Sequence, residues 1–134
     1  MTAVRPRILL ADDYDGLLEA WRRLLEPRYD VVGAVRDGDA LVDAAAALEP
    51  DVIVADLTMP GTNGLDACRR IKHSLPHTKV VLVTAGGDES VARIAFHAGA
   101  SGFVLKHRAA EDLPVAIERA LVGDTYSTRP DQRR

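Results

Sequence analysis

The sequence predicts one α/β domain in which a parallel sheet is covered by helices on both faces. Five short apolar runs alternate along the chain with five segments whose apolar residues recur at helical spacing. The runs are rich in β-branched residues and almost free of polar ones, which is typical of strands buried on both faces. The connections are short, and 134 residues make one domain that is long enough to bury a hydrophobic core.

The first half of the chain predicts three strands and two helices. A strand at 7–11 precedes a helix at 17–25, which Pro27 ends and in which Trp21 belongs to the apolar stripe. The following elements are expected at 29–35 (strand), 39–48 (an alanine-rich helix) and 52–55 (a central strand).

The second half repeats the pattern. Asn63 is expected to cap a helix whose apolar residues run from Leu65 to Leu75, and this stripe includes Cys68, which we therefore expect to be buried and inert. A strand at 79–83 follows, and then a helix that Asp88 or Ser90 caps and Gly99 ends.

A last strand at 102–105 and a last helix through 113–121 complete the set. Pro114 restricts where this helix begins, because proline is tolerated only in the first turn. Residues 123–134 have no apolar period and are expected to be a tail or the start of a linker.

The composition excludes several classes of protein. A net charge of −3 and a pI near 5.8 argue against binding of nucleic acid by this domain itself. A single cysteine and the absence of a long apolar run argue against disulfides, a signal peptide and a membrane span, so a cytoplasmic location is expected. The four histidines lack the spacing of metal ligands and are expected to be solvated.

Polar side chains follow four of the predicted strands, and the carboxyl ends of parallel strands lie at one edge of a sheet. These residues are Asp12 and Asp13, Asp56, Thr84, and Lys106. A lone aspartate there would be interpreted as a turn cap, but this set suits phosphoryl transfer to a carboxylate. The acids would hold Mg²⁺, the lysine would bind a phosphate oxygen, and Asp56 is the candidate nucleophile.

Over residues 7 to 122 the chain resembles the receiver domain of bacterial two-component response regulators. The resemblance rests on the ordered polar set, on Met59-Pro60-Gly61 after Asp56, and on Gly102-Phe103-Val104-Leu105 before Lys106. It implies a flavodoxin-like (βα)₅ fold with strand order 2-1-3-4-5, a receiver domain over 1–122 and a tail or linker over 123–134.

The resemblance also implies roles for residues. Asp56 would accept phosphate from a histidine kinase, Asp13 would bind Mg²⁺ directly, and Asp12 would assist largely through water. The backbone carbonyl of Thr58 would be a further metal ligand. In the switch, Thr84 would hydrogen-bond the phosphoryl group, Lys106 would bind it, and Phe103 would turn inward, although a plain core position for this aromatic is nearly as good an interpretation.

Two details of the sequence resemble receiver domains of the NarL/FixJ type. His107 replaces the proline that follows the lysine in many receivers, and Gly123-Asp124-Thr125-Tyr126 follows the last helix. Members usually continue into a LuxR-type DNA-binding domain and often dimerise through the last helix on phosphorylation, so an output domain outside this chain and a homodimer are expected.

Two alternatives remain at this point. A phosphatase of the haloacid dehalogenase type would need an acid two positions after the nucleophile, where Thr58 stands. A receiver-like module that binds partners without being phosphorylated would not need the complete polar set. Catalysis is expected only as weak self-phosphorylation from small phosphodonors and slow dephosphorylation.

Overall fold

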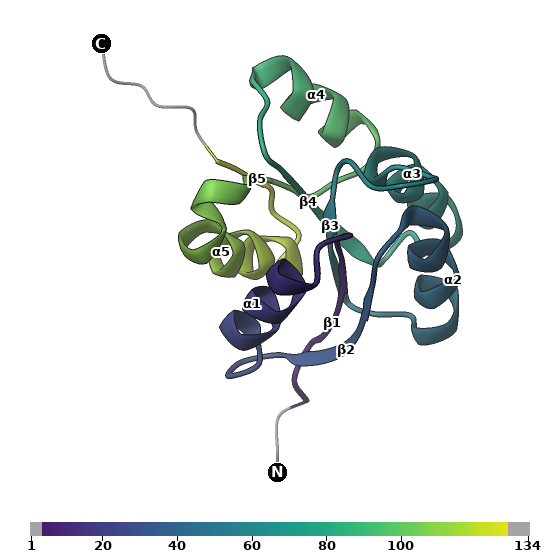
Figure 1. Ribbon diagram of the computed structural model, residues 1–134, viewed down its shortest axis with the longest axis vertical. Coiled ribbons are helices and arrows are strands. Elements are labelled where there is room, and N and C mark those ends of the chain that lie inside the picture. The colour runs from purple at the N-terminus through teal and green to yellow at the C-terminus, as the bar shows by residue number, and fades with distance from the viewer. Residues whose placement is uncertain (1–3, 129–134) are drawn as a thin grey trace.

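The computed structural model describes residues 4–128, and these form a parallel sheet between two layers of helices (Figure 1). The strand order is β2-β1-β3-β4-β5-β6, so the predicted order of the first five strands is confirmed. The strands are β1 (Arg7–Ala11), β2 (Asp30–Val35), β3 (Val52–Asp56), β4 (Lys79–Thr84), β5 (Gly102–Leu105) and β6 (Tyr126–Ser127). The helices are α1 (Asp15–Leu25), α2 (Gly38–Leu48), α3 (Gly64–Ser74), α4 (Glu89–His97), the 3₁₀ turn η1 (Lys106–Arg108) and α5 (Ala109–Leu121).

The two faces of the sheet bury two separate apolar cores. Alternate strand residues such as Ile8 and Val54 pack with α1 and α5, and Trp21 lies in this core as predicted. The opposite face, which includes Ile53 and Phe103, packs with α2, α3 and α4. Burial of β1, β3, β4 and β5 on both sides explains why their sequences are continuously apolar.

The predicted helix caps are present at α3 and α4. The Asn63 side chain accepts a hydrogen bond from the backbone of Asp66 at 2.8 Å, and Asp88 accepts from the backbone of Ser90 at 3.0 Å. Gly99, with φ of +106°, follows the end of α4 in a conformation that glycine adopts easily.

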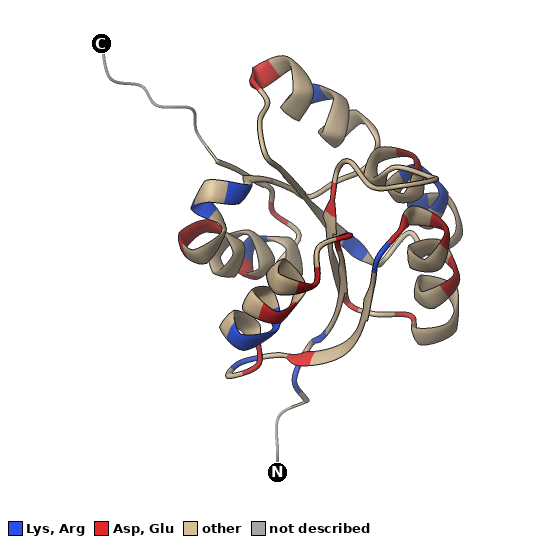
Figure 2. Ribbon diagram, viewed as in Figure 1, with Lys and Arg blue, Asp and Glu red and all other residues tan. Residues whose placement is uncertain are grey.

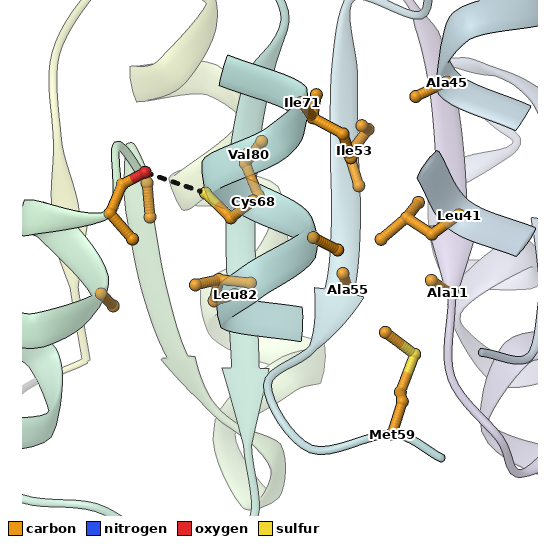
Figure 3. Close-up of a cluster of buried hydrophobic side chains, with 14 of the residues drawn as sticks. Ala11, Leu41, Ala45, Ile53, Ala55, Met59, Cys68, Ile71, Val80 and Leu82 are labelled. Atoms are coloured by element: carbon orange, nitrogen blue, oxygen red, sulfur yellow. Dashed lines mark hydrogen bonds between the residues drawn. The ribbon is translucent and has the colours of Figure 1, made fainter. Parts of the chain in front are cut away.

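Cys68 is buried between α3 and the end of α4, as predicted (Figure 3). Its thiol donates to the carbonyl of Ala98 with an S···O distance of 3.6 Å. Burial raises the pKa of this thiol to about 11. The thiolate needed for reaction is therefore scarce at neutral pH.

The last helix begins earlier than the sequence predicted from the position of Pro114. α5 starts at Ala109, so Pro114 lies inside it rather than in its first turn. The reason is that η1 runs directly from β5 into the helix. A proline at this position cannot donate to the carbonyl of Ala110, but Ala110 is exposed and water can satisfy that oxygen.

The chain after Gly123 does not remain free of secondary structure. Tyr126 and Ser127 form β6, which pairs in parallel with Gly102 and Phe103 of β5. This strand is too short to show an apolar period, which explains why the sequence predicted a tail or linker without secondary structure. The end of that predicted tail, residues 129–134, lies outside the described residues.

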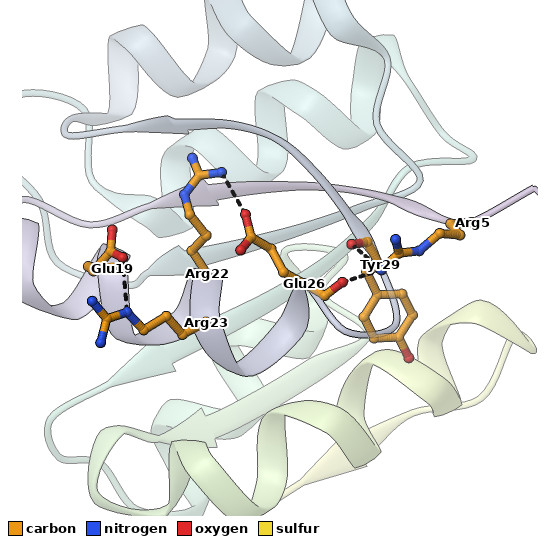
Figure 4. Close-up of polar contacts among 6 residues, drawn as sticks. All are labelled: Arg5, Glu19, Arg22, Arg23, Glu26 and Tyr29. Carbon is orange, nitrogen blue, oxygen red and sulfur yellow. Dashed lines mark hydrogen bonds and ion pairs between the residues drawn. The ribbon is translucent and has the colours of Figure 1, made fainter.

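Polar contacts secure the start of the chain against the end of α1 (Figure 4). The guanidinium of Arg5 donates to the backbone carbonyls of Glu26 and Tyr29. It thus satisfies carbonyl groups just beyond the last turn of the helix. The ion pair between Arg22 of α1 and Glu26, which directly follows the helix, is at the surface and contributes little to stability.

Acidic and basic residues are intermixed over the helices and strand ends (Figure 2). This mixture agrees with the net charge of −3. Within residues 4–128, none of the helices has the length and apolar character that a membrane span requires.

Candidate acidic site at the carboxyl edge of the sheet

Three carboxylates meet where β1 and β3 end. Oxygen atoms of Asp12, Asp13 and Asp56 lie within 4.8 Å of one another. Asp12 and Asp56 are buried, and Asp13 is exposed. The structure thus brings together the three acids that the sequence placed at one edge of the sheet.

Strand register explains this meeting. Ala11 pairs with Ala55, so the residues that follow them, Asp12 and Asp56, leave neighbouring strands side by side. The backbone N–H of Asp12 donates to Val35 at 3.1 Å, and its Oδ2 accepts from the backbone of Tyr14 at 3.0 Å. The position of Asp12 is therefore fixed by main-chain contacts on both sides.

Lys106 supplies the positive charge of the site. Its Nζ lies 3.2 Å from Oδ1 of Asp12 and 3.3 Å from Oδ2 of Asp56. Burial alone would lower the pKa of Lys106, but its contacts with the two carboxylates outweigh burial and raise it. The lysine is thus held in its charged form by the two carboxylates, one of which is the candidate nucleophile.

Asp56 has an unusual proton affinity. Burial is the largest cause and the neighbouring Asp12 adds to it, so that the pKa of Asp56 rises to about 6. The N–H of Thr58, which donates to Oδ1 of Asp56 at 3.2 Å, and the charge of Lys106 oppose this rise. The carboxylate therefore sits in a site that disfavours its own charge.

The side chains present fit a magnesium ion. Oδ1 of Asp12 is fully buried and accepts no hydrogen bond of good geometry, although Lys106 is near it. Lys106 at 3.2 Å offsets only part of the cost of burying an oxygen without a hydrogen bond, and a second cation in contact with it would offset more. Three carboxylates with one lysine leave two negative charges in excess, and carboxylate oxygens are the ligands that Mg²⁺ prefers.

Thr84 and Phe103 belong to β4 and β5, the two strands that follow β3 in the sheet. The Thr84 hydroxyl, at the end of β4, donates to the backbone carbonyl of Gly86 at 2.9 Å. Phe103 is 2% exposed and its ring lies against the loop from β4 to α4, since a Cβ on Gly87 would stand 3.2 Å from its Cζ. Both side chains therefore contact one loop.

Sequence patterns did not reveal the role of Gly64. A Cβ at this position would lie 2.1 Å from the carbonyl oxygen of Asp56. The start of α3 thus rests directly on the strand end that carries the candidate nucleophile. The only signal was the pair Asn63-Gly64, which suits a turn as well as a helix start.

We expect Asp56→Asn to stabilise the folded protein at pH 7 in the absence of Mg²⁺. The folded-state pKa of Asp56 is raised from 3.8 to about 6, so its contribution to stability is fully present below pH 4 and is lost as the pH rises through 6. After allowance for solvent screening the gain is about 1 kcal/mol. Urea unfolding at pH 4 and pH 7.5 measures it, and equal gains at both pH values would contradict the prediction.

Comparison with known proteins identifies the family. Residues 8–118 match the response regulator receiver domain. The transcriptional regulatory protein LnrK of Bacillus subtilis is 34% identical over 113 residues, which are 83% of this chain and 51% of the relative. The nitrate/nitrite response regulator NarL of Escherichia coli is 33% identical over 119 residues, 87% of this chain and 55% of the relative. The chain thus spans about half the length of these curated relatives.

Solved structures agree with this match. A LuxR-family two-component response regulator from Aurantimonas sp. superposes with a TM-score of 0.88 at 36% identity, over 95% of this chain and 91% of that one. The signal receiver domain of NarL from Mycobacterium tuberculosis superposes with a TM-score of 0.84 at 29% identity, over 90% of this chain and 99% of that one. The chain therefore belongs to the response regulator receiver domain family, within the NarL and LuxR type.

Proposed function

We propose that Asp56 accepts a phosphoryl group from a histidine kinase and that the modified domain controls an output. The observation that carries this proposal is the contact of one carboxylate, Asp56, with both Lys106 at 3.3 Å and the acidic pair Asp12 and Asp13. A structural ion pair would need one carboxylate for one lysine. The two additional acids are explained by a site that handles a cation and a phosphoryl group together.

The reaction follows from these positions. An ionised oxygen of Asp56 attacks the phosphorus of a phosphohistidine, an O–P bond forms, the P–N bond breaks, and the released imidazole takes up a proton. Lys106 exchanges its contact with Asp56 for one with a phosphoryl oxygen. Mg²⁺, when held by Asp12, Asp13, Asp56 and the backbone carbonyl of Thr58, would neutralise charge on the transferred group.

The switch uses the loop between β4 and α4. A phosphoryl group on Asp56 offers Thr84 a charged acceptor, which is stronger than the carbonyl of Gly86 that it contacts in the structure. If the hydroxyl leaves Gly86, the loop is free to move and Phe103 beneath it can repack. This difference in contacts is what allows phosphorylation to favour one arrangement over another.

The partners follow from the relatives. NarL of Escherichia coli is named as a nitrate/nitrite response regulator and LnrK as a transcriptional regulatory protein. For this chain we propose a histidine kinase as the phosphate donor, a cytoplasmic location, and transcriptional output through a DNA-binding domain outside the 134 residues.

Phosphorylation-dependent dimerisation through α5 is a further part of the proposal. A related structure is described as two RcsB dimers bound to two parallel DNAs. In this chain Leu113 and Ile117 are fully buried in the core, so a dimer would have to use the polar outer face of α5, around Glu118 and Arg119. Sedimentation at one mass with and without a phosphoryl mimic would contradict this part.

Intact mass measurement with Mg²⁺ and acetyl phosphate tests the central proposal. The native chain should gain one phosphoryl group, and the Asp56→Asn variant should gain none. The gain should reverse slowly, because only weak dephosphorylation by water is expected. If Mg²⁺ binds but no mass is gained, the chain is better explained as an interaction module that works without phosphorylation. Two observations favour either of these functions over a phosphatase of the haloacid dehalogenase type. The chain matches the receiver family, and Thr58 stands where such a phosphatase would need a second acid.

A further inference from the structure

The segment 124–128 is attached to the outer edge of β5. The backbone N–H of Tyr126 donates to the carbonyl of Ser101 at 3.0 Å, and that of Thr128 donates to Phe103 at 2.8 Å. These bonds satisfy main-chain groups of β5 that would otherwise face solvent at the sheet edge. The segment is therefore part of the folded domain.

Thr128 anchors the segment from the inside. It is 5% exposed, although it lies five residues beyond the turn that ends α5. Its hydroxyl donates to Oδ2 of Asp112 at 2.7 Å and accepts from the backbone N–H of Leu105 at 3.2 Å. One hydroxyl thus joins the segment to both α5 and β5.

The partner of this hydroxyl is a buried carboxylate. Asp112 is 3% exposed and also accepts from Arg108 at 3.2 Å. Burial alone would raise the pKa of Asp112, but the hydrogen bonds from Thr128 and Arg108 outweigh burial and lower it. Loss of the Thr128 hydroxyl would remove its hydrogen bond to Oδ2 of this buried carboxylate, while Arg108 would still pair with Oδ1, so the contact contributes to stability.

The contacts of Thr128 lie next to the residues of the proposed switch. Its N–H is bonded to Phe103, and Leu105, which it also contacts, directly precedes Lys106. A small cleft between the segment and the loop from β4 to α4 is lined by Gly87, Phe103 and Thr128 among others. A shift of Phe103 or of this loop would therefore disturb the attachment of the segment.

We propose that residues 124–128 form a latch, docked on β5 and Asp112 while Asp56 is unmodified and released when Asp56 is phosphorylated. This inference rests on the proposed function. It identifies residues 124–128 as the element through which the state of Asp56 would affect the part of the chain after residue 128. The coupling is reciprocal: if phosphorylation weakens the latch, weakening the latch must favour the phosphorylated arrangement.

Hydrogen exchange of the Tyr126 and Thr128 amides in the 134-residue chain tests the latch. We expect these amides to exchange slowly with Mg²⁺ alone. Once Asp56 carries beryllofluoride or phosphate, their exchange should be about tenfold faster, because coupling between two sites typically changes an equilibrium by about that factor. In Thr128→Val, exchange at Tyr126 should be fast in both states, and beryllofluoride should bind about tenfold more tightly than to the native chain. Ser127→Ala is the matched control, because among residues 4–128 the Ser127 hydroxyl donates to the adjacent Thr128 carbonyl and to no group of α5 or β5.

The outcomes separate the latch from the function on which it rests. The latch would be overturned if the native chain gains a phosphoryl group by mass but exchange at Tyr126 and Thr128 stays unchanged, and if Thr128→Val binds beryllofluoride with native affinity. Asp56 would then remain a phosphoacceptor. Failure of the native chain to gain mass or to bind beryllofluoride would overturn the proposed function, and the latch with it. A response in Ser127→Ala as large as in Thr128→Val would show that the hydroxyl is not the anchor.

Discussion

Lys106→Met is expected to lower the free energy of unfolding by about 2 kcal/mol at pH 7, less than the full cost of breaking a buried ion pair because Lys106 is partly exposed. The lysine is the cation that contacts both Asp12 and Asp56. Without it, two buried carboxylates of like charge face each other. The loss should shrink as the pH falls through about 6, the raised pKa of Asp56, because protonation of Asp56 removes one of the two facing charges.

Addition of Mg²⁺ should restore much of this stability. A divalent cation among Asp12, Asp13 and Asp56 replaces the missing positive charge, and it stabilises whichever state binds it. Urea unfolding with and without Mg²⁺ measures the effect. Lys79→Met is the control, since Lys79 lies at the opposite end of the sheet and has no ion pair among residues 4–128. A variant that is destabilised equally with and without Mg²⁺ would count against the metal site.

Gly64→Ala should destabilise the protein by about 3 kcal/mol or more, at the upper end of the cost of overpacking. The added Cβ would lie 2.1 Å from the carbonyl oxygen of Asp56, and both atoms belong to rigid elements, α3 and β3. Either the helix start or the strand end has to move. Because small displacements of reacting groups reduce rates strongly, phosphoryl gain by Asp56 should fall by about tenfold or more.

Gly86→Ala serves as the matched control for stability. A Cβ on Gly86 meets no atom within 4 Å, so the free energy of unfolding should change by less than about 0.5 kcal/mol. Urea unfolding and intact mass after acetyl phosphate treatment measure the two properties of each variant. Native stability and native phosphorylation in Gly64→Ala would show that the close contact is not needed to position Asp56.

The sheet and its acidic edge could be predicted because both depend on simple rules. Apolar runs of five residues separated by helical periods allow few arrangements besides a parallel sheet. In such a sheet the residues after Ala11 and Ala55 must meet, and polar groups there are seen in the sequence itself. The capping residues Asn63 and Asp88 were also predictable, since they act on main-chain groups two or three residues away.

The features that could not be predicted depend on distant partners. β6 has two residues and no period, and Thr128 is held by Asp112, which is 16 residues earlier. The position of Pro114 within α5 depends on η1, which no apolar pattern marks. Likewise, the sequence does not show that Lys106 pairs with Asp12 as well as with Asp56, because this depends on how the three side chains are oriented in the folded site.

β6 also covers the sheet edge that β5 would otherwise leave open. Without residues 124–128, β5 would present unpaired N–H and C=O groups along an open, apolar border, and such borders recruit strands from other molecules. A chain shortened at residue 122 would expose this border permanently. We therefore expect the domain without residues 123–134 to self-associate at high concentration, independently of any effect on Asp56.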